Sequence, residues 1–341
     1  MKKTLFTLLA LAGIAGAAEY VYTGDSNAWL EVAENWKNTT TNTPLSGGDQ
    51  YGNLSATQTA GNTFTVEAGT VAKGGKMCHF SNATLDIESN AQVSITGAQQ
   101  AWTNTQVNVA SGATLTYGAQ SNLSGVNIDV ASGGSLNITA KVQLNGGSIT
   151  AHGDDVSITS TVSDIKMKNY TLNILSGNIT FGKTWFDGGS NSNGINFNLG
   201  EGASVAFTTS VIKADWTTAI TLSTTFSEGY VNNGTGDVIL GEQVLINFGT
   251  RDANSNTTLS DYLTSGIFVG NSITLNDTAL TQGSFDADAL TSEDVGKYKF
   301  VVEGNTLKVQ YAAYSQMIPE PTTATLSLLA LAGLAARRRR K

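Results

Sequence analysis

One segment carries the strongest signal for the fold of this chain: Val107-Asn108-Val109-Ala110-Ser111-Gly112-Ala113-Thr114-Leu115-Thr116-Tyr117. The same phrase returns further along as Ile128-Asp129-Val130-Ala131-Ser132-Gly133-Gly134-Ser135-Leu136-Asn137-Ile138. In both copies, apolar and polar residues alternate on either side of a small turn. Alternation of this kind gives a β-strand one face that must be buried and one face that meets water.

Weaker copies of the phrase extend over residues 63–206. Their alternating segments are Phe64-Thr65-Val66, Leu85-Asp86-Ile87, Ile149-Thr150-Ala151, Leu172-Asn173-Ile174 and Phe197-Asn198-Leu199. The turn residues are Gly69, Asn90, Gly112, Gly133, Gly153, Gly177 and Gly202, at spacings of 21, 22, 21, 20, 24 and 25. Spacings that vary while the residue pattern stays the same are typical of a solenoid that accepts insertions at its corners.

One coil of about 21 residues cannot bury its apolar face alone, but stacked coils form a continuous core. Gly and Asn at the turns supply the positive φ of a sharp corner. The sequence therefore predicts an all-β protein, a parallel β-helix of about seven or more coils with β caps. The alternative is an antiparallel β-sandwich or meander in which each phrase is a hairpin. A third apolar patch, Asn122 to Val126, favours the β-helix because each coil needs a further wall.

The segments on either side of the repeats differ from them in sequence pattern. Residues 19–62 predict an N-terminal β cap, in which Trp29 and Trp36 plug the open end of the stack. The alternative role for both rings is a platform for sugars. Residues 207–312 predict irregular β coils and a C-terminal β cap, which ends in a hairpin around Gly304-Asn305.

Composition excludes several classes of protein. The 341 residues include 37 Gly but only 1 Cys and 2 His, which excludes a disulfide framework and a Cys-rich metal site. The two ends hold 7 of the 19 cationic residues and 1 of the 27 acidic residues. Residues 19–318 therefore carry 12 cations and 26 anions, a net charge of −14. An acidic body of this kind lacks the basic face of a nucleic-acid-binding protein.

Residues 1–18 predict a signal peptide. Lys2-Lys3 precede an apolar run from Leu5 to Ala12, and the small residues Ala15-Gly16-Ala17 follow. This is the order of a secretory leader, so we expect export and cleavage by signal peptidase after Ala17 or Ala18.

A sorting signal is predicted at the other end, after a linker over residues 313–318. Pro319-Glu320-Pro321 precedes an apolar stretch, 322–336, and the chain ends with Arg337, Arg338, Arg339, Arg340 and Lys341. A transmembrane helix normally needs about 20 residues, so this segment is short, and its cations would hold the chain end on the cytoplasmic side. We expect a transient membrane anchor.

These features resemble the PEP-CTERM sorting signal of Gram-negative surface and exopolysaccharide-associated proteins, here with a repetitive, autotransporter-like β-solenoid passenger. In that family, an exosortase reads the tripeptide, the apolar segment and the arginine cluster, and removes the tail. The resemblance implies an exosortase partner and a place in the cell envelope, at the cell surface or in the extracellular matrix. Because the passenger proteins of this family are diverse, the resemblance bears on sorting alone and not on the activity of the passenger. We expect a structural or adhesive protein, and the alternative is a polysaccharide-binding or polysaccharide-degrading one.

One set of polar residues takes the same place in successive phrases. The set is Asp86, Asn108, Asp129, Thr150, Asn173 and Asn198. In a stack that is in register, these residues form an outward column that could accept sugar hydroxyls or bind Ca²⁺ weakly through oxygen ligands. The alternative is a solvated polar ladder with amide hydrogen bonds between rungs. No Lys or Arg falls in this column, so a lyase-type base is missing there. A polysaccharide-active protein would be favoured if the column bordered a groove containing Trp102, Trp185 or Trp216.

Other candidate catalytic groups are isolated in the sequence. His152 lies beside Asp154 and Asp155, but adjacent strand residues point to opposite faces, so we expect a corner loop there. Cys78, next to His79, is expected to be a buried small hydrophobe rather than a nucleophile. We therefore predict a protein that is not an enzyme, with no catalytic residue, no metal site and no cofactor.

Overall fold

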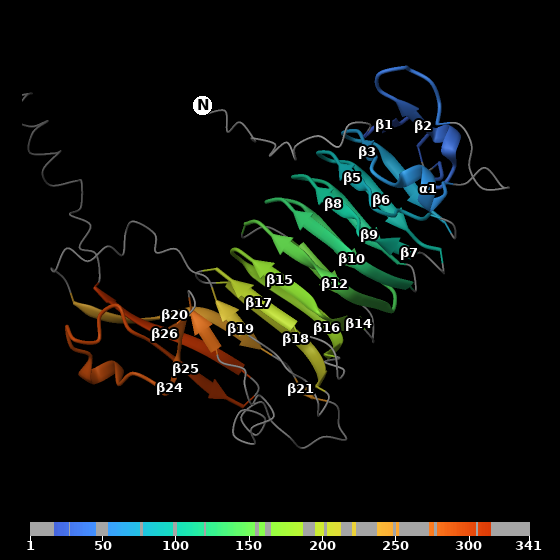
Figure 1. Ribbon diagram of the computed structural model, residues 1–341. Helices are drawn as coiled ribbons and strands as arrows, with labels where there is room; N and C mark the ends of the chain where they lie inside the picture. The colour runs from blue at the N-terminus through green and yellow to red at the C-terminus, as the bar shows by residue number, and fades with distance from the viewer. Residues whose placement is uncertain are drawn as a thin grey trace, which may run out of the picture.

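The computed structural model shows an all-β protein built on a β-solenoid of about six turns. It describes residues 17–26, 28–45, 54–75, 78–97, 101–118, 121–153, 157–160, 165–186, 195–200, 203–212, 220–222, 237–247, 250–251, 273–275, 278–304 and 306–314. Strands of successive coils stack side by side in one long array that begins at the N-terminal cap (Figure 1). The predicted parallel β-helix is confirmed. The antiparallel alternative is wrong for the repeats, because their strands pair in parallel.

Three walls of parallel strands enclose the core. The first wall contains β1 (Glu19–Tyr22), β3 (Thr63–Val66), β5 (Thr84–Ile87), β8 (Gln106–Val109), the second halves of β10 (Ser121–Val130) and β12 (Val142–Ala151), β15 (Tyr170–Ile174) and β17 (Ile195–Leu199). The second wall contains β4 (Val71–Gly74), β6 (Gln92–Ile95), β9 (Thr114–Tyr117), β11 (Ser135–Ile138) and β13 (Ser157–Ser160). The third wall contains β7 (Ala101–Thr103), the first halves of β10 and β12, β14 (Ile165–Lys168), and the second halves of β16 (Asn178–Phe186) and β18 (Ala203–Ile212). The patch from Asn122 to Val126 lies in β10, where it supplies the third wall that the sequence predicted.

The core consists of columns of apolar side chains that share a register position. In the first wall, one buried column is Phe64, Leu85, Val107, Ile128, Ile149, Leu172 and Phe197. In the second wall, the corresponding buried residues are Ala72, Val93, Leu115 and Leu136. Burying one side chain of this size contributes about 1.5–3 kcal/mol, so the columns are the main source of stability.

Left-handed residues form the corners between the walls. Between the first and second walls they are Gly69, Asn90, Gly112, Gly133, Gly153 and Gly177, with φ from 62° to 115°. These are the predicted turn residues; the seventh, Gly202, lies outside the described residues. Between the third and first walls, a second column of positive φ contains Asn82, Asn104, Gly125, Gly146 and Asn169.

Neighbouring rungs constrain one another at this second corner. The Asn104 side-chain amide donates to Asn82 Oδ1 at 3.2 Å, so the two asparagines stack. A Cβ atom added at Gly125, one rung further on, would lie 2.3 Å from Asn104 Oδ1. A side chain at position 125 would therefore displace the side-chain oxygen of Asn104 from its present position.

The N-terminal cap closes the core with one of its two tryptophans. Beyond β1, the cap contains η1 (Ala33–Asn35), β2 (Trp36–Asn38) and α1 (Ala56–Thr59). Trp36 is fully buried, its ring centroid lies 4.9 Å from that of Phe64, and its indole N–H donates to the Leu30 carbonyl at 2.6 Å. The predicted plug is confirmed for this residue.

The same prediction is wrong for Trp29, whose side chain is 46% exposed. Its backbone forms a parallel bridge with Lys73 at the edge of the second wall. Lys73 occupies an outward position between the buried residues Ala72 and Gly74. Because paired residues of parallel strands point to the same side, Trp29 points outward with it.

The C-terminal end of the stack changes strand direction. β18 pairs with β16 as far as Ile212, so the parallel coils continue beyond residue 206. β20 (Val238–Asn247) then pairs in parallel with β18 and antiparallel with β26 (Thr306–Tyr314). β25 (Tyr298–Glu303) and β26 form the predicted hairpin at Gly304. Since β26 ends at Tyr314, it includes the start of the predicted linker. The smaller elements are β19 (Ile220–Leu222), β21 (Thr250–Arg251), β22 (Ile273–Leu275), β23 (Thr278–Ala279), β24 (Thr281–Gln282) and η3 (Ala287–Ala289).

Candidate functional site: the polar column of the first wall

The predicted polar column exists as a column in space. Asp86, Asn108, Asp129, Thr150, Asn173 and Asn198 hold the same register position in β5, β8, β10, β12, β15 and β17. The residues on either side of each member along its strand are buried, so the members themselves point outward. Successive members are about 4.8 Å apart along the stack.

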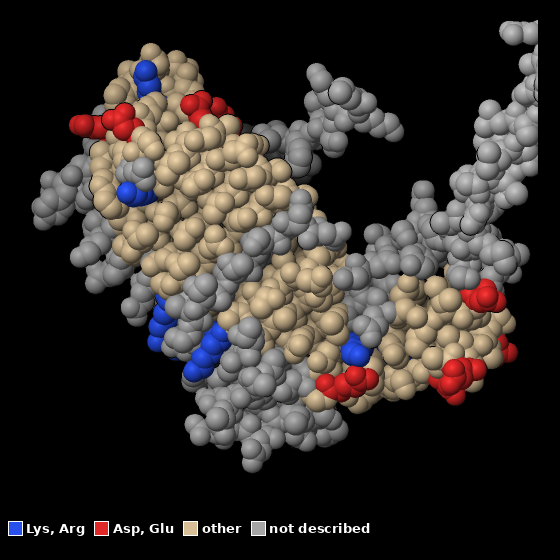
Figure 2. Space-filling view, turned by 180° about the vertical axis from the view of Figure 1, so that it is seen from behind, with Lys and Arg blue, Asp and Glu red and all other residues tan. Residues whose placement is uncertain are grey.

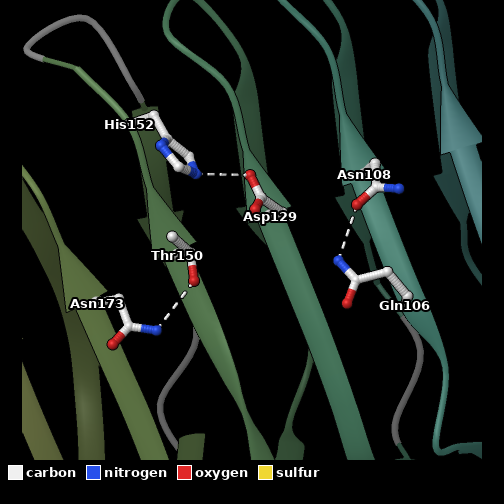
Figure 3. Close-up of polar contacts among 6 residues, drawn as sticks. All are labelled: Gln106, Asn108, Asp129, Thr150, His152 and Asn173. Carbon is white, nitrogen blue, oxygen red and sulfur yellow. Dashed lines mark hydrogen bonds and ion pairs between the residues drawn. The ribbon is translucent and has the colours of Figure 1, made fainter. Parts of the chain in front are cut away.

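The first part of the column is a chain of amide hydrogen bonds. Asn108 Nδ2 donates to Asp86 Oδ1 at 2.6 Å. Gln106 Nε2 donates to Asn108 Oδ1 at 2.8 Å (Figure 3). Burial raises the pKa of Asp86, and the hydrogen bond from Asn108 opposes that rise; Glu88 and Glu19 add to it. The Asp86 carboxyl group is therefore already engaged by its neighbours.

The middle of the column holds a contact between His152 and Asp129 that was not predicted from the sequence. His152 Nε2 lies 3.0 Å from Asp129 Oδ1, and the two side chains are 44% and 41% exposed (Figure 3). In the sequence, His152 stands beside Asp154 and Asp155, which lie outside the described residues. Thr150 pairs with Asp129 in the neighbouring rung, so aligning the two repeats at these residues would have placed His152 one rung from Asp129. In the structure, the His152 backbone N–H donates to the carbonyl of Val130.

The last part of the column repeats the amide pattern. Asn173 Nδ2 donates to Thr150 Oγ1 at 3.0 Å, and Asn198 Nδ2 donates to Asn173 Oδ1 at 2.7 Å. Each such bond contributes about 0.5–1.5 kcal/mol net. Three neighbouring pairs of the column, Asp86–Asn108, Thr150–Asn173 and Asn173–Asn198, are therefore joined by hydrogen bonds across the rungs. This is the geometry of the polar ladder, the alternative to a ligand-binding column.

The column does not bring its two carboxylates together. Asp86 and Asp129 are separated by the rung of Asn108, which places them about 10 Å apart. A Ca²⁺ ion lies about 2.3–2.6 Å from each of its oxygen ligands, so these two groups do not share one ion. Within the part of the chain that the structure describes, no group of three or more His, Cys, Asp or Glu side chains could hold a metal ion.

Cys78 and Trp102 belong to the core. Cys78 is fully buried, as predicted, and burial raises the pKa of its thiol well above the usual range. Trp102 is also fully buried, and its indole N–H donates to the Cys78 carbonyl at 2.9 Å. Trp102 therefore cannot stack on a sugar. Trp216 and the side chain of Trp185 lie outside what the structure describes.

Comparison with known proteins found no matching family model, no matching curated protein and no matching solved structure. None of the described helices is both long enough and apolar enough to cross a bilayer. The predicted signal peptide, except Ala17 and Ala18, and the predicted sorting signal at 319–341 lie outside the described residues.

Proposed function

We propose that this chain is an exported, surface-sorted structural or adhesive protein, whose β-solenoid acts as a rigid element of the cell envelope or extracellular matrix. The observation that carries the proposal is the polar column, in which three neighbouring pairs of side chains bind one another across the rungs: Asp86–Asn108, Thr150–Asn173 and Asn173–Asn198. Hydrogen bonds of this kind between rungs stiffen the stack. The continuous apolar core beneath the column supports the same role.

The position of the first strand supports export. β1 begins at Glu19, directly after the expected cleavage sites at Ala17 and Ala18. Cleavage after Ala17 leaves the Ala18 backbone N–H, which donates to Asn62 Oδ1 at 2.9 Å. Cleavage after Ala18 removes that contact but leaves every residue of β1. Either cut is compatible with the folded cap.

The last strand supports recognition of the C-terminal signal by an exosortase. β26 ends at Tyr314, and Pro319 follows soon after, so the sorting motif begins just beyond the solenoid and its cap. In this proposal the motif consists of Pro319, Glu320 and Pro321 with the arginines Arg337 to Arg340. The body is exported, held briefly by the apolar segment 322–336, and released from it by cleavage.

Deletion of residues 322–341 tests the sorting proposal in a host that has an exosortase. We expect the membrane-bound precursor to disappear and the body to accumulate in the periplasm or the medium. Replacing Pro319-Glu320-Pro321 by three alanines should leave the precursor uncleaved in the membrane. The matched control replaces Ser315, Gln316 and Met317 by alanine and should be sorted normally. Identical fractionation of the truncated and full-length chains would refute the proposal.

Polysaccharide binding or degradation is the competing function. The observation in its favour is the partly exposed Asp129–His152 pair, which offers an acid and a base at 3.0 Å. Depolymerisation of glycans, measured with and without Ca²⁺, separates the two functions. Product release that is lost in the Asp129→Ala variant would replace the structural role with an enzymatic one.

A further inference from the structure

The outer face of the second wall begins at an exposed aromatic ring. Trp29 is 46% exposed, and its backbone forms a parallel bridge with Lys73 of β4, so its side chain points outward at the start of this wall. Hydrogen bonds fix the backbone here, because the Leu30 N–H donates to the Lys73 carbonyl at 2.6 Å and Asn35 Nδ2 donates to the Trp29 carbonyl at 2.8 Å. Trp29 therefore presents a large apolar surface from a fixed position.

The indole lies where it does because residue 75 has no side chain. A Cβ atom added at Gly75 would lie 3.2 Å from Trp29 Cε3 and would overlap Glu31 Oε1. The Glu31 side chain is buried, and its Oε2 accepts from the Gly75 N–H at 2.8 Å. This carboxylate is held by the backbone, so it adds little exposed negative charge beside the ring.

Two columns of mostly small polar residues continue this face along the stack. In β4, β6, β9 and β11, one register position holds Lys73, Ser94, Thr116 and Asn137, and another holds Val71, Gln92, Thr114 and Ser135. All of them are exposed or partly exposed, with neighbouring rungs about 4.8 Å apart and the two columns about 6.6 Å apart. In β13, the same positions are Ser157 and Thr159, which are also uncharged residue types. We call Trp29 and the two columns of β4, β6, β9 and β11 the hydroxyl face; its one charged member is Lys73.

The polar groups of the hydroxyl face are not bound to one another. Within the part of the chain that the structure describes, five of its side chains make no hydrogen bond: Gln92, Ser94, Thr114, Thr116 and Ser135. The polar column of the first wall differs, because three of its neighbouring pairs are joined across the rungs. The second wall therefore offers donors and acceptors to a ligand in three successive rungs, those of β6, β9 and β11.

We propose that the hydroxyl face binds a neutral, extended polysaccharide with flat sugar rings, a β-linked glucan of the cellulose type. In such a sugar the hydroxyl groups are equatorial, so each ring has an apolar C–H face that can stack on the indole of Trp29. Tryptophan is enriched among the residues that dominate binding energy, since it combines a large apolar area with few rotatable bonds. A glucan that runs along the stack from Trp29 meets hydroxyl or amide groups at each rung, and these can hydrogen-bond to its own hydroxyls.

Charge favours a neutral occupant over a charged one. Residues 19–318 carry a net charge of −14, so a polyanion or a second copy of this chain would be repelled by the body. Acidic side chains gather near the two ends of the molecule, and a broad area along the stack between them carries no coloured, charged side chain (Figure 2). A polycation would be drawn to those ends rather than to the hydroxyl face. This inference rests on the proposed surface role and names its partner.

Binding of the purified full chain to amorphous cellulose tests the inference. We expect Trp29→Ala to bind at least about tenfold more weakly, because the largest apolar contact is lost. Trp29→Tyr should retain most of the binding, which separates loss of the aromatic ring from loss of folding. The matched control is Leu175→Ala, which removes an equally exposed apolar side chain, also 46%, directly after β15 of the first wall. This control should bind as the native chain does.

Two matched double variants test the polar columns. Thr114→Val/Thr116→Val in β9 should bind about fivefold more weakly, because two hydrogen-bonding groups are lost while β-branched side chains keep the strand. Thr63→Val/Thr65→Val makes the same change at the outward positions of β3 in the first wall, and should leave binding unchanged. Equal binding by the two double variants would overturn the inference.

Competitors and salt separate the candidate occupants. Cellohexaose should displace the chain from cellulose and dextran should not, and about 0.5 M NaCl should leave binding unchanged because no ion pair carries it. Absence of cellulose binding, equal displacement by dextran, or tighter binding to alginate that salt abolishes would each overturn the inference. Dimerisation in solution that Trp29→Ala abolishes would overturn it in favour of a second copy of the chain. Because binding is measured on purified chain, it can fail while sorting succeeds, and the reverse.

Discussion

The walls and the corners of the solenoid follow different rules. A wall strand such as β11 keeps strict alternation, since Leu136 and Ile138 point inward and their neighbours point outward. A corner keeps only one left-handed residue, and the length of chain between successive corners is uneven. The walls therefore hold the register, whereas the corners absorb changes in length.

A one-residue deletion should separate the two regions most clearly. Removing Asp129 from β10 makes Ile128 and Val130 adjacent, so one of these two buried side chains must turn to the outer face, and we expect loss of the cooperative folding transition. Removing Ser132 from the adjacent corner should leave a folded protein with a lower melting temperature. Urea unfolding followed by circular dichroism measures both. If the two deletions have equal effects, walls and corners do not differ in the way described.

Truncation within a wall is the next largest effect. Leu136 is fully buried and lies between Leu115 and Ile158 in neighbouring rungs. Leu136→Ala should lower the free energy of unfolding by about 2–5 kcal/mol, through lost burial and a residual cavity. The control is Asp129→Ala, which should cost less than about 0.5 kcal/mol because its ion pair with His152 is exposed. Equal costs in urea melts would mean that the alternation does not separate core from surface.

Substitution at a corner should cost less and depend on backbone conformation alone. Gly69 has a φ of +74°, and nothing lies within 4 Å of a Cβ atom added there. Gly69→Ala should therefore cost about 1–2 kcal/mol, the strain of a left-handed residue with a side chain. Gly69→Asn should cost less, since Asn90 holds the equivalent corner with a φ of 62°. A smaller loss for alanine than for asparagine would contradict this account.

The smallest effect concerns the pH dependence of the polar column. Burial raises the pKa of Asp86, so the protonated form is favoured in the folded state. The neutral Asp86 carboxyl group makes its full contribution to stability below its unfolded-state pKa of about 3.9. This contribution is lost as the pH rises through its folded-state pKa. Relative to the native chain, Asp86→Asn should gain on the order of 2 °C in melting temperature between pH 4 and pH 7. Thermal melts across that range check it, and a relative loss would reverse the sign.

The repeats could be predicted from the sequence because their signal is local. Alternation with a period of two assigns Val107 and Val109 to the inside without any knowledge of the partner strand. The same pattern placed Asp86, Asn108 and Asp129 in one outward column, as the register confirms. The first inference needs only one strand, and the second needs only the comparison of successive repeats.

Features that depend on contacts between rungs or outside the repeat were harder to predict. Trp29 is exposed because its backbone pairs with Lys73, a contact between segments that share no repeated phrase. His152 reaches Asp129 across a rung, so reading its neighbours in sequence pointed to the wrong partners. β20 pairs in parallel with β18 and antiparallel with β26. This change of direction comes after the repeats end, so no repeated sequence pattern predicts it.

The stacked rungs have a mechanical consequence. The hydrogen bonds between rungs point roughly along the axis of the stack, so tension applied between its ends loads them directly. Each coil touches only its neighbours, and the coil at the end yields first. Every rupture would release about 21 residues, or about 70 Å of extended chain. A solenoid fixed to a surface and pulled from its far end would therefore lengthen in steps and absorb work at each one.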